Sequence, residues 1–344
     1  MNKENIKNIF YNFVKDKKVI EIQENRIGHI NNTFFIYTKN RKYVLQKISH
    51  IFNRKNVCFN IKEIFYFLKN KKDSWKIWES FKILTPVFLA DWKICLNYKN
   101  EFYRLYEFIE NSIVLDEITL ENTEDIWRWI WEFYSYLDWF NWNLKEPFDN
   151  FHNIRFYYNQ YLKLDKNYKY NKNQEEIKIK NWIDSNVNKL EKYADLIEKL
   201  PKRLIHQDMK LSNMLFDENW EKLVSIVDWD TFDLWSILID FWDMCRSFIT
   251  KVDYNLEIFE LFLKGYFSKM KDILTNEEKQ NLLLAFEMIN LELAIRYFNQ
   301  YLWWEKVFNL ENKEILQKIL KLYNTANFLK NNKQNLEQIV LKYI

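Results

Sequence analysis

Residues 203–230 read RLIHQDMKLSNMLFDENWEKLVSIVDWD. This pattern predicts a short apolar strand, a polar loop, and an apolar hairpin that ends on an acid. The loop contains His206-x-Asp208-x4-Asn213, and the hairpin ends at Asp228. A histidine, an acid and an amide at this spacing, followed by a second acid, are typical of the base and the metal ligands of a phosphoryl-transfer site. A structural loop with the same residues by chance is the alternative, because short patterns of this kind are common.

The polar side chains of this segment have distinct predicted roles. Phosphoryl transfer requires removal of a proton from the accepting hydroxyl and neutralisation of charge on the phosphate oxygens. We expect Asp208 to act as the base, and Asn213 and Asp228 to bind Mg²⁺ through oxygen atoms, which this hard cation prefers. His206 is predicted to brace the loop. Lys210 is predicted either to contact the transferred phosphate or to lie on the surface.

The composition is that of a globular protein with ample length for a core. The 344 residues are 48% hydrophobic and 29% charged, with a formal net charge of +3. The length predicts about two domains or lobes, and the small net charge gives no general attraction to nucleic acid or anionic membranes. The N-terminal segment lacks the apolar core of a signal peptide, and no window is apolar enough for a membrane span. We therefore expect a cytoplasmic protein.

The cysteines are few and irregularly spaced. Cys58, Cys95 and Cys245 all lie in apolar segments. An odd, scattered set fits neither a disulfide framework nor a metal site. They are predicted to be buried, reduced side chains that pack like small hydrophobic residues.

Tryptophan and glycine occur in unusual numbers. The chain contains 15 tryptophans and 2 glycines, whereas glycine usually makes up about 7% of a protein. Trp92, Trp142 and Trp220 occupy turn-like positions at which a positive φ would favour glycine. Our hypothesis is that many of these tryptophans are glycines in the native protein, encoded by UGA, which some bacterial lineages translate as glycine. A truly tryptophan-rich protein with unusual turns is the alternative.

Hydrophobic periodicity divides the chain into a sheet-forming part and a helical part, so an α+β fold is predicted. Residues 1–20 form a predicted amphipathic helix. Strand-like segments follow, at residues 34–37, 43–48, 87–90, 94–96 and 102–109. From about residue 119 onward, apolar residues recur with helical spacing. The central loop and hairpin interrupt this helical part.

Candidate nucleotide-binding groups lie in the sheet-forming part. Gly28 lies in a loop before a strand, where backbone N–H groups can approach phosphates, although an ordinary turn has the same pattern. Lys47 ends the strand YVLQK and is either a solvent-facing lysine or one that reaches a phosphate. Glu63, in the following helix, is either a surface side chain or an ion-pair partner of Lys47. The backbone at Glu107 and Ile109 is a candidate for hydrogen bonds to an adenine edge.

In the same order along the chain, these segments resemble those of the aminoglycoside phosphotransferase/choline kinase superfamily, which has a protein-kinase-like fold. IHQDMKLSNMLFD is similar to its catalytic loop, and IVDWDT is similar to its metal-binding motif. Within the superfamily, the closer resemblance is to N-acetylhexosamine kinases. It rests on the segments GHINNTFFI, YVLQKI, YRLYEFIENS, DNFHN and SILIDFWDMCRSF.

The resemblance implies a two-lobed kinase-like fold. Residues 1–110 would form a small lobe with an antiparallel sheet and a helix that bind ATP. Residues 111–344 would form a larger, mainly helical lobe with the catalytic loop and the acceptor site. By motif, Asp208 would be the catalytic base, Asn213 and Asp228 the Mg²⁺ ligands, and Lys47 the phosphate-contacting lysine.

The same resemblance implies supporting residues and shows departures. Asp240 would brace the catalytic loop from the following helix, and His29 and Arg296 would contact a sugar. Tryptophan replaces the usual glycine in two motifs, at Trp235 and Trp242, and it occupies a GxxxG-like spacing in the first helix of the large lobe. This pattern of departures is what the UGA hypothesis predicts.

The sequence therefore predicts an ATP- and Mg²⁺-dependent kinase that phosphorylates a hydroxyl of a small sugar. The expected acceptor is an N-acetylhexosamine at its anomeric position. An aminoglycoside or choline-type kinase is the alternative within the superfamily, and an inactive nucleotide-binding pseudokinase or scaffold is the alternative outside it. Retention of Asp208, Asn213 and Asp228 argues against the inactive protein. Neither nucleic acid nor a membrane is an expected partner.

Overall fold

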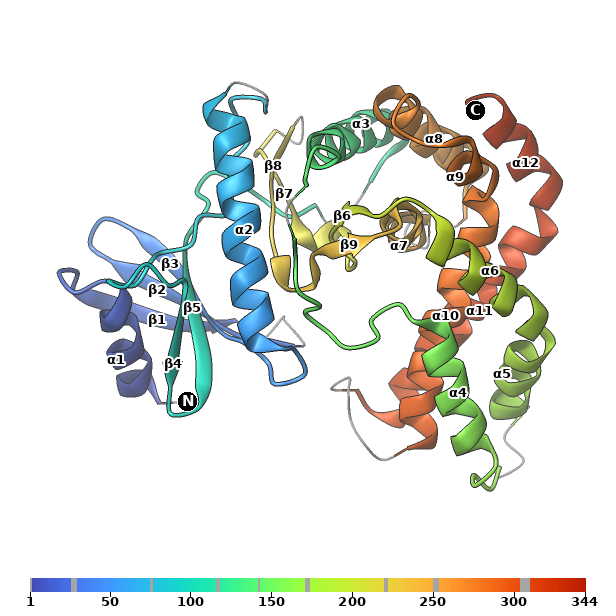
Figure 1. Ribbon diagram of the computed structural model, residues 1–344, viewed down its shortest axis with the longest axis horizontal. Coiled ribbons are helices and arrows are strands. Elements are labelled where there is room, and N and C mark those ends of the chain that lie inside the picture. Colours follow the sequence, from blue (N-terminus) through green and yellow to red (C-terminus); the bar gives the residue numbers. More distant parts are fainter. Residues whose placement is uncertain are drawn as a thin grey trace. The chain divides into compact units, whose positions relative to one another are not determined.

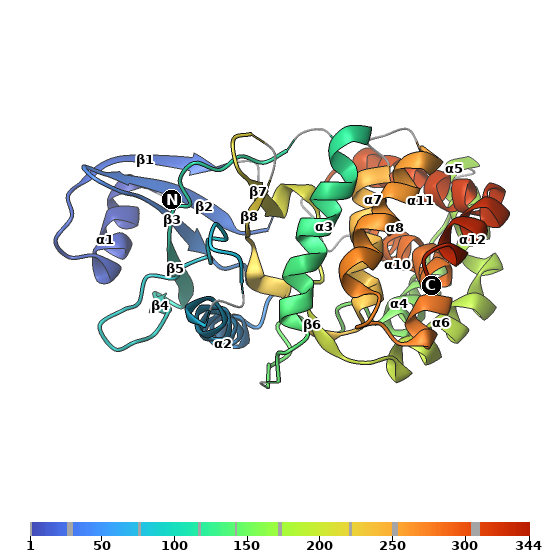
Figure 2. The same ribbon diagram turned by 90° about the horizontal axis from the view of Figure 1, so that it is seen from above.

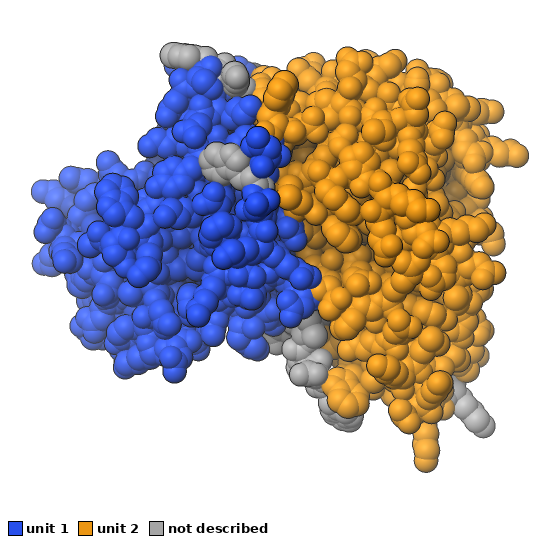
Figure 3. Space-filling model, viewed as in Figure 1, with its two compact units in different colours: residues 1–114, 140–149, 213–233 blue, residues 115–139, 150–212, 234–344 orange. Residues whose placement is uncertain are grey.

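The computed structural model describes residues 2–25, 30–74, 77–115, 118–141, 143–170, 174–219, 222–249, 254–303 and 310–344. The chain forms two compact units (Figure 3), and each is described by itself. Unit 1 contains residues 1–114, 140–149 and 213–233, and unit 2 contains residues 115–139, 150–212 and 234–344. The predicted functional division at residue 110, into a nucleotide lobe and an acceptor lobe, stays a prediction.

Unit 1 is built on a five-stranded antiparallel sheet with strand order β1-β2-β3-β5-β4 (Figure 1). Its elements are α1 (Lys3–Phe13), β1 (Val19–Asn25), β2 (Asn32–Thr38), β3 (Lys42–Lys47), α2 (Arg54–Asp73), β4 (Cys95–Tyr98) and β5 (Glu101–Glu107). The hairpin of β7 (Met214–Phe216) and β8 (Leu223–Ile226), and the short helix η2 (Trp229–Thr231), also belong to this unit.

One face of the sheet packs against α1. The apolar side of this helix, with Ile6, Ile9 and Phe10, is buried among strand residues that include Tyr43 and Leu45. Since side chains alternate between the two faces of a strand, this packing assigns a face to every residue of β3.

Unit 2 is mainly helical (Figure 2). Its helices are α3 (Leu120–Leu137), α4 (Ile154–Asp165), α5 (Gln174–Ser185), α6 (Val187–Lys199), α7 (Ile237–Ile249), α8 (Leu256–Met270), α9 (Asn276–Gln280), α10 (Leu282–Leu302), α11 (Asn312–Asn331) and α12 (Lys333–Leu341). Strand β6 (Arg203–Ile205) pairs with β9 (Asp233–Trp235), and the helical turn η1 (Leu211–Asn213) follows the loop after β6. The sheet and the larger helical part confirm the predicted α+β class.

Two local predictions were wrong. Residues 87–90 form no strand; instead Pro86 makes an isolated bridge to Tyr106. The ladder does not continue, because the Leu89 N–H donates to the Lys93 carbonyl in a turn of its own segment. Cys58 and Cys95 form a disulfide with a Cα–Cα distance of 6.1 Å, which joins α2 to β4. These cysteines are 37 positions apart in the sequence, and only the fold brings them together. Cys245 is buried and free, as predicted.

Several tryptophans occupy positions that suit a smaller residue. Trp92 has a φ of 61° and is 70% exposed. Trp127, Trp131 and Trp242 are fully buried, and their indole N–H groups have no hydrogen-bond partner within the described residues. A buried donor left without a partner costs about 1–3 kcal/mol. The UGA hypothesis accounts for these features, whereas the predicted turns at residues 142 and 220 lie outside the described residues.

Helices α3 and α8 approach each other closely at Gly265. A Cβ atom added to this residue would lie 2.7 Å from both the Glu124 carbonyl oxygen and the Trp127 Cβ. Only a residue without a side chain fits such a contact. Concerning membranes, none of the helices within the described ranges combines the length and apolarity that crossing a bilayer requires.

Candidate functional site

The predicted metal ligands lie at the same end of the β7–β8 hairpin in unit 1. Asn213 directly precedes β7, and Asp228 follows β8 after one residue. The register pairs Met214 with Ile226, and the Val227 N–H donates to the Asn213 carbonyl oxygen at 2.9 Å. The antiparallel pairing therefore brings together two residues that are 15 positions apart in the sequence.

The chemistry of this pair fits Mg²⁺. Asp228 has a left-handed backbone, with φ 64° and ψ 59°, a region that aspartate and asparagine enter more readily than most other residues. It supplies a carboxylate and Asn213 supplies an amide oxygen, which are hard ligands. Within the described ranges, no cluster of three His, Cys, Asp or Glu side chains has metal-binding geometry. A site made of one acid, one amide, and phosphate or water oxygens is therefore the kind that these residues can form.

The predicted base lies in the loop after β6 in unit 2. The side chain of Asp208 is 29% exposed, and its Oδ2 forms an ion pair with the Lys210 Nζ at 2.7 Å. A partly exposed carboxylate can meet an acceptor that enters from solvent. Lys210 lies beside the predicted base, and its contact with the transferred phosphate stays a prediction.

Asp240, on α7, holds the backbone of this loop. Its Oδ2 accepts the His206 N–H at 2.6 Å and the Tyr134 hydroxyl at 2.5 Å, and its Oδ1 accepts the Gln207 N–H at 2.8 Å. Asp240 and His206 are fully buried. Burial raises the pKa of the Asp240 carboxyl, and contact with His206 and Tyr134 opposes that rise. The geometry is that of the predicted brace, and Tyr134 is a partner that sequence reasoning missed.

A second brace comes from His152, which lies in the segment DNFHN. Its Nε2 lies 3.0 Å from the Gln207 carbonyl oxygen, and its Nδ1 lies 3.0 Å from Glu292 on α10. Burial lowers the pKa of His152, but the Glu292 carboxylate outweighs this effect and raises it above the ordinary value. Gln207, the residue before Asp208, has a φ of 65°. Asp240 accepts its N–H and His152 contacts its carbonyl group, so its backbone is held on both sides.

Arg296 lies in the same buried region of unit 2. Its guanidinium is 11% exposed, lies 3.8 Å from Glu292, and covers the rings of Phe151 and Tyr157. Arg296 and His152 thus share Glu292 as a partner, and the contact of Arg296 with a sugar stays a prediction. His29, the other predicted sugar contact, and Gly28, the predicted phosphate-loop glycine, lie outside the described residues.

Lys47 has a different ion-pair partner from the predicted Glu63, and its contact with a phosphate stays a prediction. Its Nζ pairs with Glu101 at 2.8 Å, and Arg54 binds the same carboxylate at 3.0 Å. Glu63 is therefore not its ion-pair partner, and the pair that forms is partly exposed, at 32% for Lys47 and 38% for Glu101. By strand alternation Lys47 shares the face of Tyr43 and Leu45, which is covered by α1.

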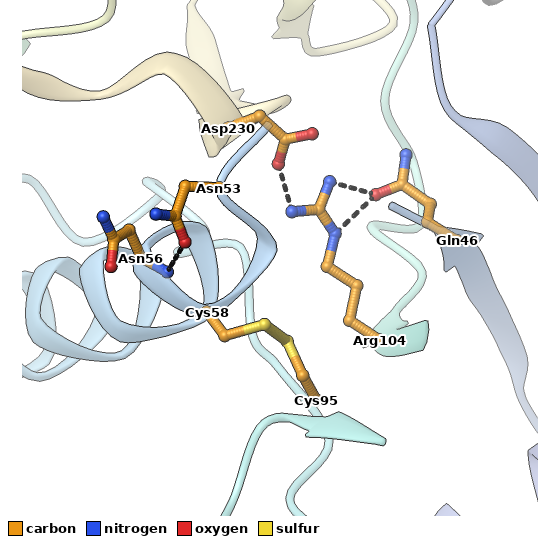
Figure 4. The surroundings of a disulfide bond; sticks show 7 residues. All are labelled: Gln46, Asn53, Asn56, Cys58, Cys95, Arg104 and Asp230. Carbon is orange, nitrogen blue, oxygen red and sulfur yellow. Dashed lines mark hydrogen bonds and ion pairs between the residues drawn. A yellow bond between two sulfur atoms is a disulfide. The ribbon is translucent and has the colours of Figure 1, made fainter. Parts of the chain in front are cut away.

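The buried cation of the sheet is Arg104, on β5. It pairs with Asp230, and its Nε and Nη2 atoms donate to the Gln46 Oε1 at 3.0 and 2.8 Å (Figure 4). Arg104 and Asp230 are 1% and 2% exposed. Sequence reasoning missed both residues, although an arginine inside an apolar strand and a second acid two residues after Asp228 were visible signals.

The predicted adenine-binding backbone follows β5. The Glu107 N–H donates to the Thr85 carbonyl at 3.0 Å, and the Ile109 carbonyl accepts the Ser112 hydroxyl at 2.8 Å. The Glu107 side chain pairs with Arg41 at the surface. Among the described residues, the Ile109 N–H donates no hydrogen bond to another backbone group. Ile109 therefore has the group that an adenine contact would need.

Known structures share this fold. The chain resembles the microcompartment-associated aminopropanol kinase, with a TM-score of 0.63, 13% identity, and coverage of 96% of this chain and 98% of that one. It resembles choline kinase LicA from Streptococcus pneumoniae, with a TM-score of 0.57, 14% identity, and coverage of 94% and 98%. It also resembles ADP-bound aminoglycoside phosphotransferase APH(2'')-Ib, with a TM-score of 0.57, 16% identity, and coverage of 95% and 99%. Identities this low show a common fold.

Sequence comparison gives two further findings. DNA-directed RNA polymerase subunit beta'' of Plasmodium falciparum (isolate 3D7) is 27% identical over 229 residues. That match covers 51% of this chain and only 22% of the length of the curated relative, so it carries no assignment. The model of the phosphotransferase enzyme family, APH, matches residues 21–267, which include the catalytic loop and both predicted metal ligands. The chain belongs to this phosphotransferase enzyme family, as its resemblance to the aminoglycoside phosphotransferase/choline kinase superfamily predicted.

Proposed function

We propose that the chain is an ATP- and Mg²⁺-dependent kinase that phosphorylates a neutral sugar, an N-acetylhexosamine at its anomeric hydroxyl. Family membership supports phosphoryl transfer. ATP as donor is supported by the ADP in solved relatives, such as spectinomycin phosphotransferase in complex with ADP and spectinomycin. The sugar is supported by the resemblance of the sequence to N-acetylhexosamine kinases and by the charges of unit 2.

In this proposal the residues of the two units have separate tasks. Asp208 accepts the proton of the sugar hydroxyl. The oxygen of that hydroxyl attacks the γ-phosphorus of ATP, and the bond between the γ-phosphorus and the oxygen that stays with ADP breaks. Lys210, already beside Asp208, faces the negative charge of the phosphate. Asn213 and Asp228 would hold Mg²⁺, and its charge would neutralise the phosphate oxygens. Asp240 and His152 keep the backbone before Asp208 in place.

The observation that carries the choice of acceptor is the pairing of charges near Asp208. The Tyr297 hydroxyl lies within electrostatic reach of Asp208 and of three other charged groups, those of Arg246, Arg296 and Asp243, so these side chains form one cluster. Its carboxylates already have cationic partners in the chain. The pairs are Lys210–Asp208, Arg246–Asp243, His152–Glu292 and Arg296–Glu292.

A cationic acceptor gains little from such a cluster. Choline, ethanolamine or an aminoglycoside would bring a positive charge next to Arg246 and Arg296, and each carboxylate it could meet is already neutralised. Like charges brought together in this way oppose binding. A neutral sugar meets donors and acceptors for its hydroxyl groups without a charge penalty.

An acceptor panel tests the proposal. The wild-type chain, ATP and Mg²⁺ are incubated with N-acetylglucosamine, N-acetylgalactosamine, glucosamine, choline, ethanolamine and an aminoglycoside, and ADP release and phosphorylated product are measured. The matched pair is N-acetylglucosamine and glucosamine, which differ only at the C2 nitrogen: the first carries a neutral acetamide and the second an amine that is largely protonated at neutral pH. We expect kcat/KM for the neutral sugar to exceed that for glucosamine by at least about tenfold. Preference for choline or an aminoglycoside would contradict the acceptor, and no transfer to any compound would favour the inactive scaffold.

A further inference from the structure

Strand alternation separates Lys47 from the metal-binding end of the β7–β8 hairpin. Lys47 follows Tyr43 and Leu45 on the face of the sheet covered by α1. Gln46 points to the opposite face, where its cross-strand partner is Arg104. Arg104 reaches Asp230, two residues beyond Asp228. Arg104 is therefore a cation on the opposite face from Lys47, and it is the one that pairs with Asp230.

Asp230 is held from two directions within unit 1. Its Oδ1 is bound by the Arg104 Nη1, and its Oδ2 accepts the Asn31 Nδ2 at 2.5 Å. The Asn31 Oδ1 in turn accepts the Ser49 N–H at 2.9 Å. Both oxygens of this buried carboxylate are thus bound, one by a side chain of β5 and the other by a side chain of the segment before β2. Asp230 therefore serves as an anchor for the segment that contains Asp228.

The guanidinium of Arg104 is itself fixed. Gln46 accepts two of its N–H groups, and the Gln46 amide donates to the Thr33 hydroxyl at 3.2 Å. The ring of Tyr106 lies beneath the guanidinium, 5.3 Å from it. A planar fork held at three nitrogens keeps one orientation, which a lysine could not reproduce. Arg104 also lies within electrostatic reach of Asp228.

We propose that Arg104 and Asp230, and not Lys47, form the ion pair that positions the metal ligand Asp228 on the nucleotide-binding sheet. Arg104 is a positioning residue: it fixes Asp230, and the two-residue connection to Asp228 then fixes the left-handed backbone from which the metal-binding carboxylate projects. Asn31 extends the link to the segment that leads into β2. This inference rests on the proposed function in one respect, because it takes Asp228 to be a Mg²⁺ ligand.

Direct binding of Mg²⁺ and ADP tests the pair without any acceptor. Calorimetry measures the Kd of ADP with saturating Mg²⁺, and the Mg²⁺ concentration for half-maximal ADP binding, in the full chain. The matched variants are Arg104→Gln and Lys47→Gln, which each remove one cation, and Arg104→Lys, which restores charge without the fork. Residues that orient metal ligands usually change metal affinity by about 10- to 100-fold when replaced.

We expect Arg104→Gln to raise the half-maximal Mg²⁺ concentration by at least about tenfold, Arg104→Lys to recover part of that loss, and Lys47→Gln to stay within about twofold of wild type. A merely structural role would lower the melting temperature and leave the Mg²⁺ requirement of the folded fraction unchanged. The proposal is overturned if Lys47→Gln shows the loss and Arg104→Gln does not.

A milder variant covers the case in which Arg104→Gln fails to fold. Asn31→Ala removes one partly exposed donor to Asp230 and leaves the ion pair intact. We expect the same direction of change in its Mg²⁺ requirement, and an unchanged requirement would count against the anchor. Wild-type binding of Mg²⁺ and ADP without transfer to any acceptor would contradict the proposed function and still leave this comparison decisive.

Discussion

The carboxylate of Asp240 offers the sharpest perturbation of the catalytic loop. Asp240→Asn keeps the volume of the side chain but replaces one acceptor oxygen with a donor. In the best placement the amide oxygen stays at Oδ2, where it accepts from His206 and Tyr134. The amide nitrogen then faces the Gln207 N–H, which loses its partner.

The expected loss of stability follows from the three hydrogen bonds that Asp240 accepts. A buried donor without a partner costs about 1–3 kcal/mol, and each of the two remaining bonds loses about 1 kcal/mol when its acceptor becomes neutral. Removing a buried charge offsets part of this loss, because burial raises the pKa of Asp240 and so opposes its ionised form. We expect the free energy of unfolding to fall by about 2–4 kcal/mol.

Activity should fall by more than stability alone explains. Gln207 directly precedes Asp208, so release of its N–H displaces the base, and a displacement of about 1 Å can cost about 100-fold in kcat. The control is Tyr134→Phe, which removes one donor to Asp240 and keeps both backbone bonds of the loop. It should lose about 1–2 kcal/mol of stability and little kcat. Urea unfolding and steady-state kinetics measure both quantities, and equal kcat values for Asp240→Asn and wild type would refute the reasoning.

Three further predictions concern the protonation of a buried histidine, the disulfide and the tryptophans. Because the folded-state pKa of His152 is raised, the stability that its protonated form contributes should be complete below about pH 6.5 and lost as pH rises through the folded pKa. The unfolding free energy of His152→Gln should therefore approach that of wild type at high pH, and a gap that widens with pH would contradict this. The Cys58–Cys95 bond joins residues that are 37 positions apart. Its reduction should lower the free energy of unfolding by about 2–4 kcal/mol. Three titratable thiols in the unreduced, denatured protein would show that no bond exists. Peptide mass spectrometry of protein from its native source should find glycine at Trp127 and Trp242, and tryptophan masses there would end the UGA hypothesis.

Local features of this chain were predictable from sequence. The spacing of Asp208 and Asn213 lies within one loop, and the apolar run before Asp228 predicts the hairpin that brings the two metal-ligand candidates together. Hydrophobic periodicity gave the sheet-forming and helical parts, because alternation and helical spacing are properties of neighbouring residues. These are interactions over short sequence distances.

Longer-range features were not predictable in the same way. In YVLQKI both Val44 and Leu45 are apolar, so the pattern does not say which face Lys47 occupies; packing against α1 decides it. Arg104 and Asp230 are 126 positions apart, so no local sequence spacing predicts their ion pair. The disulfide likewise depends on the fold, which brings Cys95 on β4 next to Cys58 on α2. Each of these contacts exists only once the strands have paired.

Transfer of labelled phosphate from γ-labelled ATP by wild type and by Asp208→Asn is the most direct test of the central claim. Both proteins are given N-acetylglucosamine and Mg²⁺ and are matched for fold by their melting temperatures and for nucleotide binding by their Kd for ADP. We predict label in the sugar at its anomeric oxygen for wild type, and a rate lower by about 100-fold or more for Asp208→Asn, because the base that removes the hydroxyl proton is gone. Equal rates for the two proteins, or no labelled sugar from wild type, would contradict the account.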